Sequence, residues 1–295
     1  MKTLLPTPQC VDCLISLANR STVLPGIGAC NAEKQAQAAA RRIVENTRNG
    51  GLSSPQIANR IMREIRNLTG IEDPYGEFKA REMEQAQKIF SSMKNHVGED
   101  LQSCISLAIL GNSLDFFKDP EQSLAEVPQQ FKQGIAFFRD DIDTLDAFLE
   151  KRPERILYLA DNAGEIYFDL PLHEYIRRRS GQVFLIVKGG PSLNDLTRVE
   201  LQSARLEEMF DHVTDTGTDG VGIDWENVSE EFLDLVDGAD LIVSKGVANF
   251  ETLYPREVPP ATFYLFKVKC EPIKIHLRAP LDSYLALWKQ GTDGH

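Results

Sequence analysis

The sequence contains no apolar run close to the roughly 20 consecutive residues that a membrane-spanning helix requires. It also lacks an excess of basic residues, since 32 Lys and Arg stand against 44 Asp and Glu, a formal net charge of −12. This balance disfavours sequence-independent binding to nucleic acid or to anionic membranes, although a locally basic pocket can still bind a small anionic substrate. The N-terminal segment has only Lys2 as a basic residue, so we expect no signal peptide and a cytoplasmic protein.

Cysteine is scarce as well, with five residues in 295, and the odd number argues against a disulfide framework. Cys10 and Cys13 have the Cys-x-x-Cys spacing of metal and redox sites, but no second such pair follows. Three interpretations stay open. The pair can be two small residues on an inward-packing helix, part of a structural or regulatory metal site completed by Cys30 or Cys270, or a redox pair.

The first half of the chain is predicted to be helical. Residues 54–69 have Ser54 as a candidate N-cap, Pro55 in the first turn, apolar residues at helical spacing, and Gly70 as the stop. Gly, Pro and Asn signals separate the other predicted helices, at about 29–50, 76–94, 98–110, 121–136 and 139–150. No strand is expected before about residue 155.

After Pro153, short apolar runs replace the long helical patterns. The predicted strands are RILYLA, QVFLIV, ADLIVS and TFYLFKV, and helical patterns separate the first three. Nearly continuous apolar strands alternating with helices are typical of a parallel sheet covered on both faces, and right-handed crossovers make it doubly wound. We therefore predict an all-helical domain over residues 1–150 and a Rossmann-like α/β domain over residues 151–295.

Polar residues and glycines gather where the predicted strands end, which is the edge at which open α/β sheets bind ligands. The residues at these ends are, in chain order, Asp161, Asn162, Gly164, Glu165; Lys188, Gly189, Gly190, Asn194, Asp195; Lys245, Gly246, Asn249; and Lys267, Lys269, Cys270. Taken singly, Asp-Asn-x-Gly also fits a turn, and Asn194-Asp195 also fits a helix cap. Their convergence on one edge is what predicts a functional site.

The side chains at this edge indicate phosphoryl chemistry. Asp161, Asn162 and Asp195 offer oxygen ligands, which suit Mg²⁺ or Mn²⁺ and are also compatible with Co²⁺ and Ni²⁺. The lysines expected to bind a phosphate as point charges are Lys188, Lys245 and Lys267. Glycines let the backbone approach the ligand, and helix N-termini favour anions. A metal, a phosphate cradle and lysines together suit electrostatic support of a phosphoryl group.

The sequence does not match the motifs of two familiar classes of site. A dinucleotide or methyltransferase Rossmann site needs Gly-x-Gly-x-x-Gly after the first strand, and the sequence there is Asp161-Asn162-Ala163-Gly164. Haloacid-dehalogenase-like phosphatases need Asp-x-Asp at the same place, and the second Asp is Ala163 here. The missing second acid disfavours a covalent aspartyl route, so a metal-activated water is the expected nucleophile.

The motifs together resemble the ARMT-like damage-control phosphatase family, in particular its prokaryotic Cys-x-x-Cys branch. They are DNAGE, KGGPSLNDLT, SKGVANFETL and KVKCEPI in the second half, and CVDC, TGIEDPYGEFK and LAILGNSLDFF in the first. The resemblance implies a helical part packed on a Rossmann-like domain, and a divalent-metal-dependent phosphatase that acts on small phosphorylated metabolites, often sugar phosphates or damaged cofactors. After Cys270 the sequence departs from the family pattern, so Lys269 and Cys270 are not assigned to the site.

The same resemblance implies roles for individual residues. It makes Asp161, Asn162 and Asp195 the metal ligands, in agreement with the spacing. The residues that would contact or polarise the phosphate are Glu165, Lys245, Asn249 and Lys267. Asn112 and Asp115 would close the pocket from the helical half and meet the organic part of the substrate, although Asn112-x-x-Asp115 also fits a helix cap.

We therefore predict phosphomonoester hydrolysis. In this hypothesis the metal is held by Asp161, Asn162 and Asp195. The developing charge is neutralised by Lys245 and Lys267, and either Glu165 or Asp115 orients or deprotonates the water. Two other functions stay open: an S-adenosylmethionine-dependent carboxyl methyltransferase, and a non-catalytic sensor that binds a phosphorylated metabolite. The sequence indicates no oligomeric state.

Overall fold

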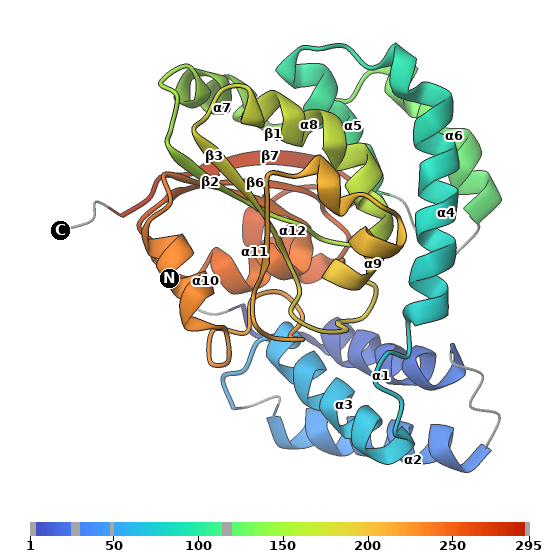
Figure 1. The fold of residues 1–295 in the computed structure, drawn as a ribbon. Helices are drawn as coiled ribbons and strands as arrows, with labels where there is room; N and C mark the ends of the chain where they lie inside the picture. Colours follow the sequence, from blue (N-terminus) through green and yellow to red (C-terminus); the bar gives the residue numbers. More distant parts are fainter. Residues whose placement is uncertain (1–3, 25–29, 48–49, 114–119, 293–295) are drawn as a thin grey trace.

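The computed structural model describes residues 4–24, 30–47, 50–113 and 120–292. A seven-stranded sheet lies between two layers of helices, and three N-terminal helices form a separate group at one end of the molecule (Figure 1). The fold is mixed α/β with a mostly parallel sheet, as the sequence predicts.

The four predicted strands form the centre of the sheet. They are β2 (Arg155–Leu159), β3 (Gln182–Val187), β5 (Leu241–Lys245) and β6 (Ala261–Lys267). In β2, Ile156 and Tyr158 pack into the core on one face of the sheet, while Leu157 and Leu159 pack into the core on the other. Burial on both faces explains why these strands are nearly continuous apolar runs.

Three further strands were not predicted, namely β1 (Phe137–Asp140), β4 (His212–Asp215) and β7 (Tyr284–Lys289). The expectation that no strand precedes residue 155 is therefore wrong. β1 and β4 are four residues long and none of their side chains is fully buried, while β7 has no β-branched residue. β1 and β4 are thus too short and too exposed for the buried-strand pattern, and β7 lacks the β-branched residues that favour a strand over a helix. The division into domains at residue 150 stays a prediction.

The strand order is β1-β7-β6-β5-β2-β3-β4. The five strands from β6 to β4 are parallel to one another, β7 is antiparallel to β6, and β1 is parallel to β7. The chain proceeds from β2 outward through β3 to β4, and then returns to the opposite side of β2 as β5. The carboxyl ends of β2 and β5 therefore flank the topological switch point, where ligands bind in sheets of this kind.

The N-terminal helices pack around a core of their own. They are α1 (Pro8–Val23), α2 (Cys30–Thr47) and α3 (Ser54–Thr69), and their shared core includes Leu14, Ala40, Ile57 and Ile61. The N-cap of α3 is Ser53 rather than the predicted Ser54, since the Ser53 side chain accepts a hydrogen bond from the Gln56 backbone N–H; Gly70 ends the helix at a φ of 69°. Asn59 of α3 accepts a hydrogen bond from Val221 N at 2.7 Å, which ties this group to the sheet's loops.

The remaining helices cover the two faces of the sheet (Figure 1). On one face lie α4 (Gly76–Met93), α5 (Leu101–Ser113), α6 (Pro120–Gln133), α7 (Ile142–Leu149) and α8 (Ile166–Arg177). On the other lie α10 (Glu230–Asp237), α11 (Val247–Leu253) and α12 (Glu271–Leu277), while α9 (Arg198–Ser203) follows the loop after β3.

Helix α5 is buried along its length, and this burial places its last turn in the switch-point region. Ile105, Leu107 and Ile109 are fully buried in the core. Gly111 faces Phe168 of α8 so closely that a Cβ at Gly111 would lie 2.9 Å from Phe168 Cβ. This close packing of α5 on α8 sets the position of the next residue, Asn112.

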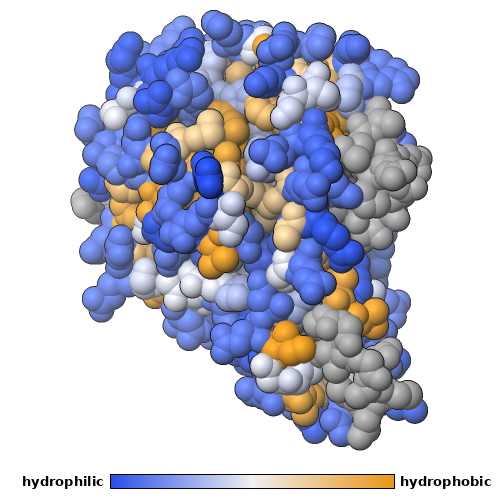
Figure 2. All heavy atoms as spheres, turned by 45° about the vertical axis from the view of Figure 1, so that its right-hand side comes forward, coloured by the Kyte–Doolittle hydropathy of each residue, from blue (hydrophilic) through white to orange (hydrophobic). Residues whose placement is uncertain are grey.

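The surface is mostly hydrophilic, with smaller hydrophobic areas between charged side chains on the face in Figure 2. None of the described helices is both long enough and apolar enough to span a bilayer.

Candidate active site

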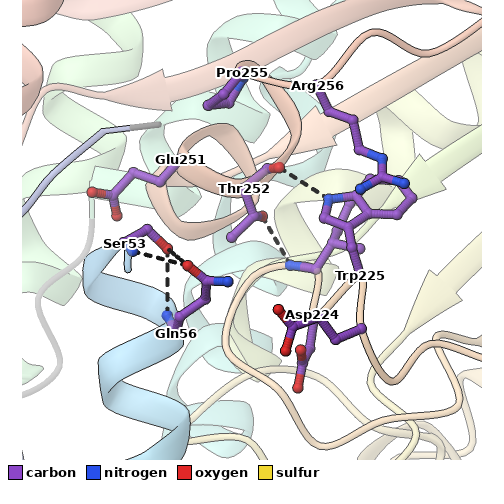
Figure 3. Close-up of a pocket in the computed structure, with 10 residues that line it drawn as sticks. Ser53, Gln56, Asp224, Trp225, Glu251, Thr252, Pro255 and Arg256 are labelled. Carbon is purple, nitrogen blue, oxygen red and sulfur yellow. Dashed lines mark hydrogen bonds between the residues drawn. The ribbon is translucent and has the colours of Figure 1, made fainter. Parts of the chain in front are cut away.

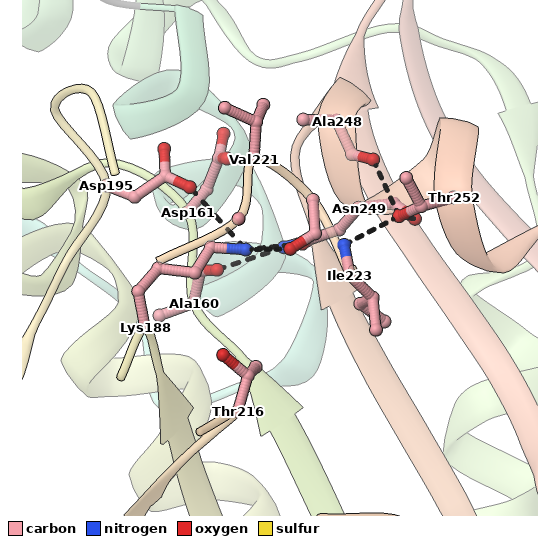
Figure 4. Close-up of polar contacts among 12 residues, drawn as sticks. Ala160, Asp161, Lys188, Asp195, Thr216, Val221, Ile223, Ala248, Asn249 and Thr252 are labelled. Atoms are coloured by element: carbon pink, nitrogen blue, oxygen red, sulfur yellow. Dashed lines mark hydrogen bonds and ion pairs between the residues drawn. The ribbon is translucent and has the colours of Figure 1, made fainter. Parts of the chain in front are cut away.

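Backbone pairing brings the candidate metal ligands together. Asn162 and Asp195 form an antiparallel β-bridge, and Asp161 O accepts a hydrogen bond from Leu196 N at 2.8 Å. Ala163 N donates to Asn194 O at the same distance. The loop after β3 is thereby joined to the end of β2, and the carboxylates of Asp161 and Asp195 lie side by side in Figure 4.

The end of β5 closes on the Asp161 carboxylate from the other side. Gly246 has a φ of 79°, in the left-handed region that favours glycine, and a Cβ at this position would overlap the Asp161 carboxylate. The third strand end thus meets the first at a spot where only a residue without a side chain fits.

A buried network of hydrogen bonds fixes Glu165. Its Oε1 accepts from Asn162 Nδ2 at 2.8 Å and from Asn112 Nδ2 at 3.0 Å, and its Oε2 accepts from Lys245 Nζ at 3.1 Å. Asn112 Nδ2 also lies 2.9 Å from Asp161 Oδ2. Because Asn162 uses its amide nitrogen on Glu165, its amide oxygen is the atom that it can offer to a cation.

The ammonium group of Lys245 makes three hydrogen bonds within the protein. Its ammonium donates to Ala108 O at 3.1 Å, to Glu165 Oε2, and to Asp169 Oδ1 at 2.6 Å, which uses all three of its hydrogens. The charges of Asp169 and Glu165 raise the pKa of Lys245 against the opposing effect of burial. In this arrangement Lys245 holds Glu165 in place, and the predicted contact with a phosphate would require one of these bonds to break.

Lys188 and Asn249 form a second network under the site (Figure 4). Lys188 Nζ donates to Gly222 O and to Asn249 Oδ1, the latter at 3.3 Å, and lies 3.5 Å from Asp195 Oδ2. Asn249 Nδ2 donates to Ala160 O at 3.0 Å and to Lys245 O at 2.9 Å. Asn249 therefore links the ends of β2 and β5, and Lys188 is a counter-charge for Asp195.

Burial and like charge both act on the two aspartates. Burial raises the pKa of Asp161 well above its usual value, and the charges of Glu165 and Asp195 raise it further. Burial also raises the pKa of Asp195, while Lys188 opposes the shift. Two carboxylates held together in this way repel each other, and a bound cation would relieve that repulsion.

The donor set fits a hard divalent cation. Two carboxylates and one amide oxygen come from Asp161, Asn162 and Asp195, and oxygen ligands are those that Mg²⁺ and Mn²⁺ prefer. Within the described ranges, no group of three or more His, Cys, Asp or Glu side chains is arranged to hold a metal. The candidate set here counts two carboxylates and one amide. Water and substrate would complete such a site.

The structure does not bring every predicted side chain to this place. The Lys267 ammonium pairs with Asp282 Oδ1 at 2.8 Å and lies 5.9 Å from the centre of the Tyr284 ring, while only the Lys267 backbone N–H reaches Asn112, at 3.1 Å. Its predicted contact with phosphate is therefore not supported by the position of the side chain. Asp115 lies outside the described residues.

Two residues to which the sequence assigned no role also lie here. Lys269 is exposed, and its positive charge lowers the pKa of both Asp161 and Glu82. Glu82 of α4 is buried against Gly164, accepts a hydrogen bond from Asn194 Nδ2 at 3.3 Å, and has its pKa raised to about 8 by burial. In the sequence, Lys269 was noted only as a residue at a strand end, two positions past Lys267 in KVKC. Nothing in the sequence indicated that Glu82 lies at the site.

Oxygen donors thus lie at the switch point of a Rossmann-like sheet with lysines behind them, an arrangement that could hold a cation beside a phosphoryl group. Comparison with known proteins identifies a phosphatase family. A sequence model described as the damage-control phosphatase ARMT1-like domain matches residues 7–285. The chain belongs to this family.

Relatives support the assignment across most of the chain. A protein named damage-control phosphatase from Pyrococcus horikoshii is 34% identical over 276 residues, which cover 91% of this chain and 94% of the relative. Another damage-control phosphatase, from Archaeoglobus fulgidus, is 32% identical over 74% of this chain and 76% of its own. The crystal structure of a DUF89 family protein from Pyrococcus horikoshii superposes with a TM-score of 0.86 at 31% identity, covering 96% of this chain and 98% of that one. These relatives support an enzyme with phosphatase activity.

Proposed function

We propose that this chain is a divalent-metal-dependent phosphatase that hydrolyses phosphomonoesters of small metabolites, such as sugar phosphates or damaged phosphorylated metabolites. The observation that carries the proposal is the pair of buried carboxylates, Asp161 and Asp195, held side by side at the switch point. Both have raised pKa values, and the first cause is burial. Such a pair is costly to bury unless a cation shares it.

Asp161, Asn162 and Asp195 would hold the metal. When bound, a divalent cation supplies Lewis-acid polarisation of a phosphoryl oxygen and lowers the pKa of a water. Asn112 and Lys188 keep the two carboxylates in position, through contacts of 2.9 Å to Asp161 and 3.5 Å to Asp195.

Glu165 is the candidate base. Asn112, Asn162 and Lys245 hold its carboxylate at fixed hydrogen-bonding distances, so it can orient a water without reorganisation. Lys269 is the cation best placed to meet a phosphate, because among the described residues its side chain forms no ion pair or hydrogen bond and it lies near Asp161. In this role it replaces the predicted Lys267.

The test uses metal-stripped protein with p-nitrophenyl phosphate and a panel of sugar phosphates, to which Mg²⁺, Mn²⁺, Co²⁺ and Ni²⁺ are returned singly. Asp195→Asn is assayed beside Asp211→Asn, whose exposed carboxylate pairs with Arg177 just before β4 begins, at the amino end of the sheet. We expect turnover that requires a metal, is lost in Asp195→Asn and is retained in Asp211→Asn.

Full activity without metal, or in Asp195→Asn, would contradict the proposal. Stabilisation by a phosphate ester without any turnover would point to a sensor. Binding of S-adenosylmethionine in the absence of metal would point to the methyltransferase.

A further inference from the structure

A cavity of about 340 Å³ lies between the N-terminal helices and the carboxyl edge of the sheet. We call it the α1 cavity. Its walls come from α1, α3, the loop before Asp195, the loop before Ile223, α11 and the start of α12. Its lining is largely apolar and includes Leu14, Leu17, Ala58, Leu193, Val221 and Ala248. A volume of this size suits a small organic group, since ligand sites measure about 300–1,000 Å³.

The α1 cavity adjoins the candidate active site through shared segments of chain. Leu193 stands two residues before Asp195, and Ala248 stands two residues after Gly246, which packs on the Asp161 carboxylate. Lys269 also lines the cavity, and its charge acts on Asp161. A phosphoryl group beside Asp161 would therefore direct the rest of its molecule into this cavity.

Glu251 is the only acid among the described residues of the cavity wall. Its carboxylate forms no hydrogen bond or ion pair with the described residues, and burial raises its pKa to about 7. Figure 3, which draws a smaller cavity on the other side of this residue, shows the Glu251 side chain pointing away from Trp225 and Arg256. A partly buried carboxylate without a partner is unfavourable, and a hydrogen-bond donor on a ligand would satisfy it.

We propose that the α1 cavity binds the alcohol part of the phosphomonoester, and that Glu251 selects alcohols that combine an apolar chain with a hydrogen-bond donor such as an amide N–H. This inference rests on the proposed phosphatase function and narrows its substrate class. A polyhydroxylated sugar is a poorer match, because several of its hydroxyls would be buried without partners against Leu14, Leu17 and Val221.

The first experiment compares four esters with the metal-loaded protein: ethyl phosphate, hexyl phosphate, 6-acetamidohexyl phosphate and glucose 6-phosphate. We expect kcat/KM to be highest for 6-acetamidohexyl phosphate, then hexyl phosphate, with glucose 6-phosphate well below both. The step from ethyl to hexyl should exceed roughly tenfold, because each buried methylene adds discrimination. Equal kcat/KM for the four esters, or a preference for glucose 6-phosphate, would overturn the assignment.

The second experiment narrows the cavity. Cys13 of α1 is an exposed residue that lines the α1 cavity. The neighbouring Asp12 is also exposed on α1 but does not line the cavity. In Cys13→Trp the ratio of kcat/KM for hexyl phosphate to that for ethyl phosphate should fall roughly tenfold, since the indole displaces the chain. In Asp12→Trp the ratio should stay as in the native protein. A ratio that is the same in both variants would contradict the proposal.

The third experiment removes the acceptor. In Glu251→Leu we expect the preference for 6-acetamidohexyl over hexyl phosphate to approach unity, while hexyl phosphate itself is still hydrolysed and so reports an intact fold. An unchanged preference for 6-acetamidohexyl phosphate would show that Glu251 does not accept a hydrogen bond from the amide N–H of the ligand. Failure of the phosphatase itself looks different: none of the four esters would then be hydrolysed with any metal, and both proposals would fall.

Discussion

The buried ammonium of Lys245 donates a hydrogen bond of 2.6 Å to Asp169 Oδ1. The same ammonium also holds Glu165, so one cation balances two carboxylates from α8 and the turn before it. Burial raises the pKa of Asp169 to about 6 against the opposing charge of Lys245. The Lys245–Asp169 pair therefore anchors the candidate base to the sheet. Its loss should lower the free energy of unfolding directly, and should affect catalysis only through the position of Glu165.

Lys245→Met should lower the free energy of unfolding by about 3–5 kcal/mol, because two buried carboxylates lose their cation. The matched control is Lys267→Met. Lys267 pairs with the exposed Asp282, and such surface pairs contribute less than about 1 kcal/mol. Denaturant titration of both variants measures the difference. Equal losses in the two variants would refute the anchoring role of Lys245.

Gly246→Ala should abolish metal binding as well as reduce stability. A Cβ at this position overlaps the Asp161 carboxylate, so the aspartate must leave its place beside Asp195. Gly134→Ala is the control, since Gly134 has a similar φ of 81° and nothing within 4 Å of its would-be Cβ. It should cost only the backbone strain, about 1–2 kcal/mol, and bind metal normally. Calorimetric titration with Mn²⁺ compares the two, and metal binding by Gly246→Ala would contradict the site geometry.

Much of this arrangement could be predicted from the sequence, for two physical reasons. Strands buried on both faces, such as β2, are nearly continuous apolar runs, and the carboxyl ends of parallel strands meet at one edge. Asp161, Asn162 and Asp195 were therefore expected together, and the structure places them together. The four-residue edge strands β1 and β4 carry no such apolar run, and β7 is apolar but has no β-branched residue.

The direction of long side chains could not be predicted. A lysine after a strand looks the same in sequence whether its ammonium turns inward, as Lys245 does toward Asp169, or outward, as Lys267 does toward Asp282. Glu82 reaches Gly164 only through the packing of α4 on the turn after β2, a contact between residues distant in sequence. Such placements depend on tertiary packing rather than on local pattern.

Metal binding should release protons and strengthen as the pH rises. The raised pKa of Asp161, caused first by burial and then by the charges of Glu165 and Asp195, keeps a proton on the metal-free site to higher pH than usual. A metal ligand must lose that proton. Calorimetry of Mn²⁺ binding in two buffers with different ionisation enthalpies counts the protons. The native protein and Asp224→Asn, whose carboxylate pairs with Arg63, should release the same number of protons. Proton uptake on binding would contradict the expected sign.

Acid should destabilise the protein partly through His173. This side chain is buried between Tyr158 and Phe210, with ring centroids at 5.8 and 4.7 Å, and its Nε2 has no hydrogen-bond partner among the described residues. Burial lowers the pKa of His173 from 6.5 to about 4, so the unfolded chain binds the proton first as the pH falls. The stability that the neutral ring contributes is therefore present above pH 6.5 and is lost progressively toward pH 4.

The loss should be about 2 kcal/mol between pH 6.5 and 5, at about 1.4 kcal/mol per pH unit. His173→Phe keeps an aromatic ring against Tyr158 and Phe210 but cannot take up the proton, so its unfolding free energy should fall less over this range. His96→Gln, at an exposed position, should follow the native protein. Urea titrations of the three proteins at pH 7, 6 and 5 make the comparison. A pH dependence of His173→Phe as steep as that of the native protein would show that other groups control acid unfolding.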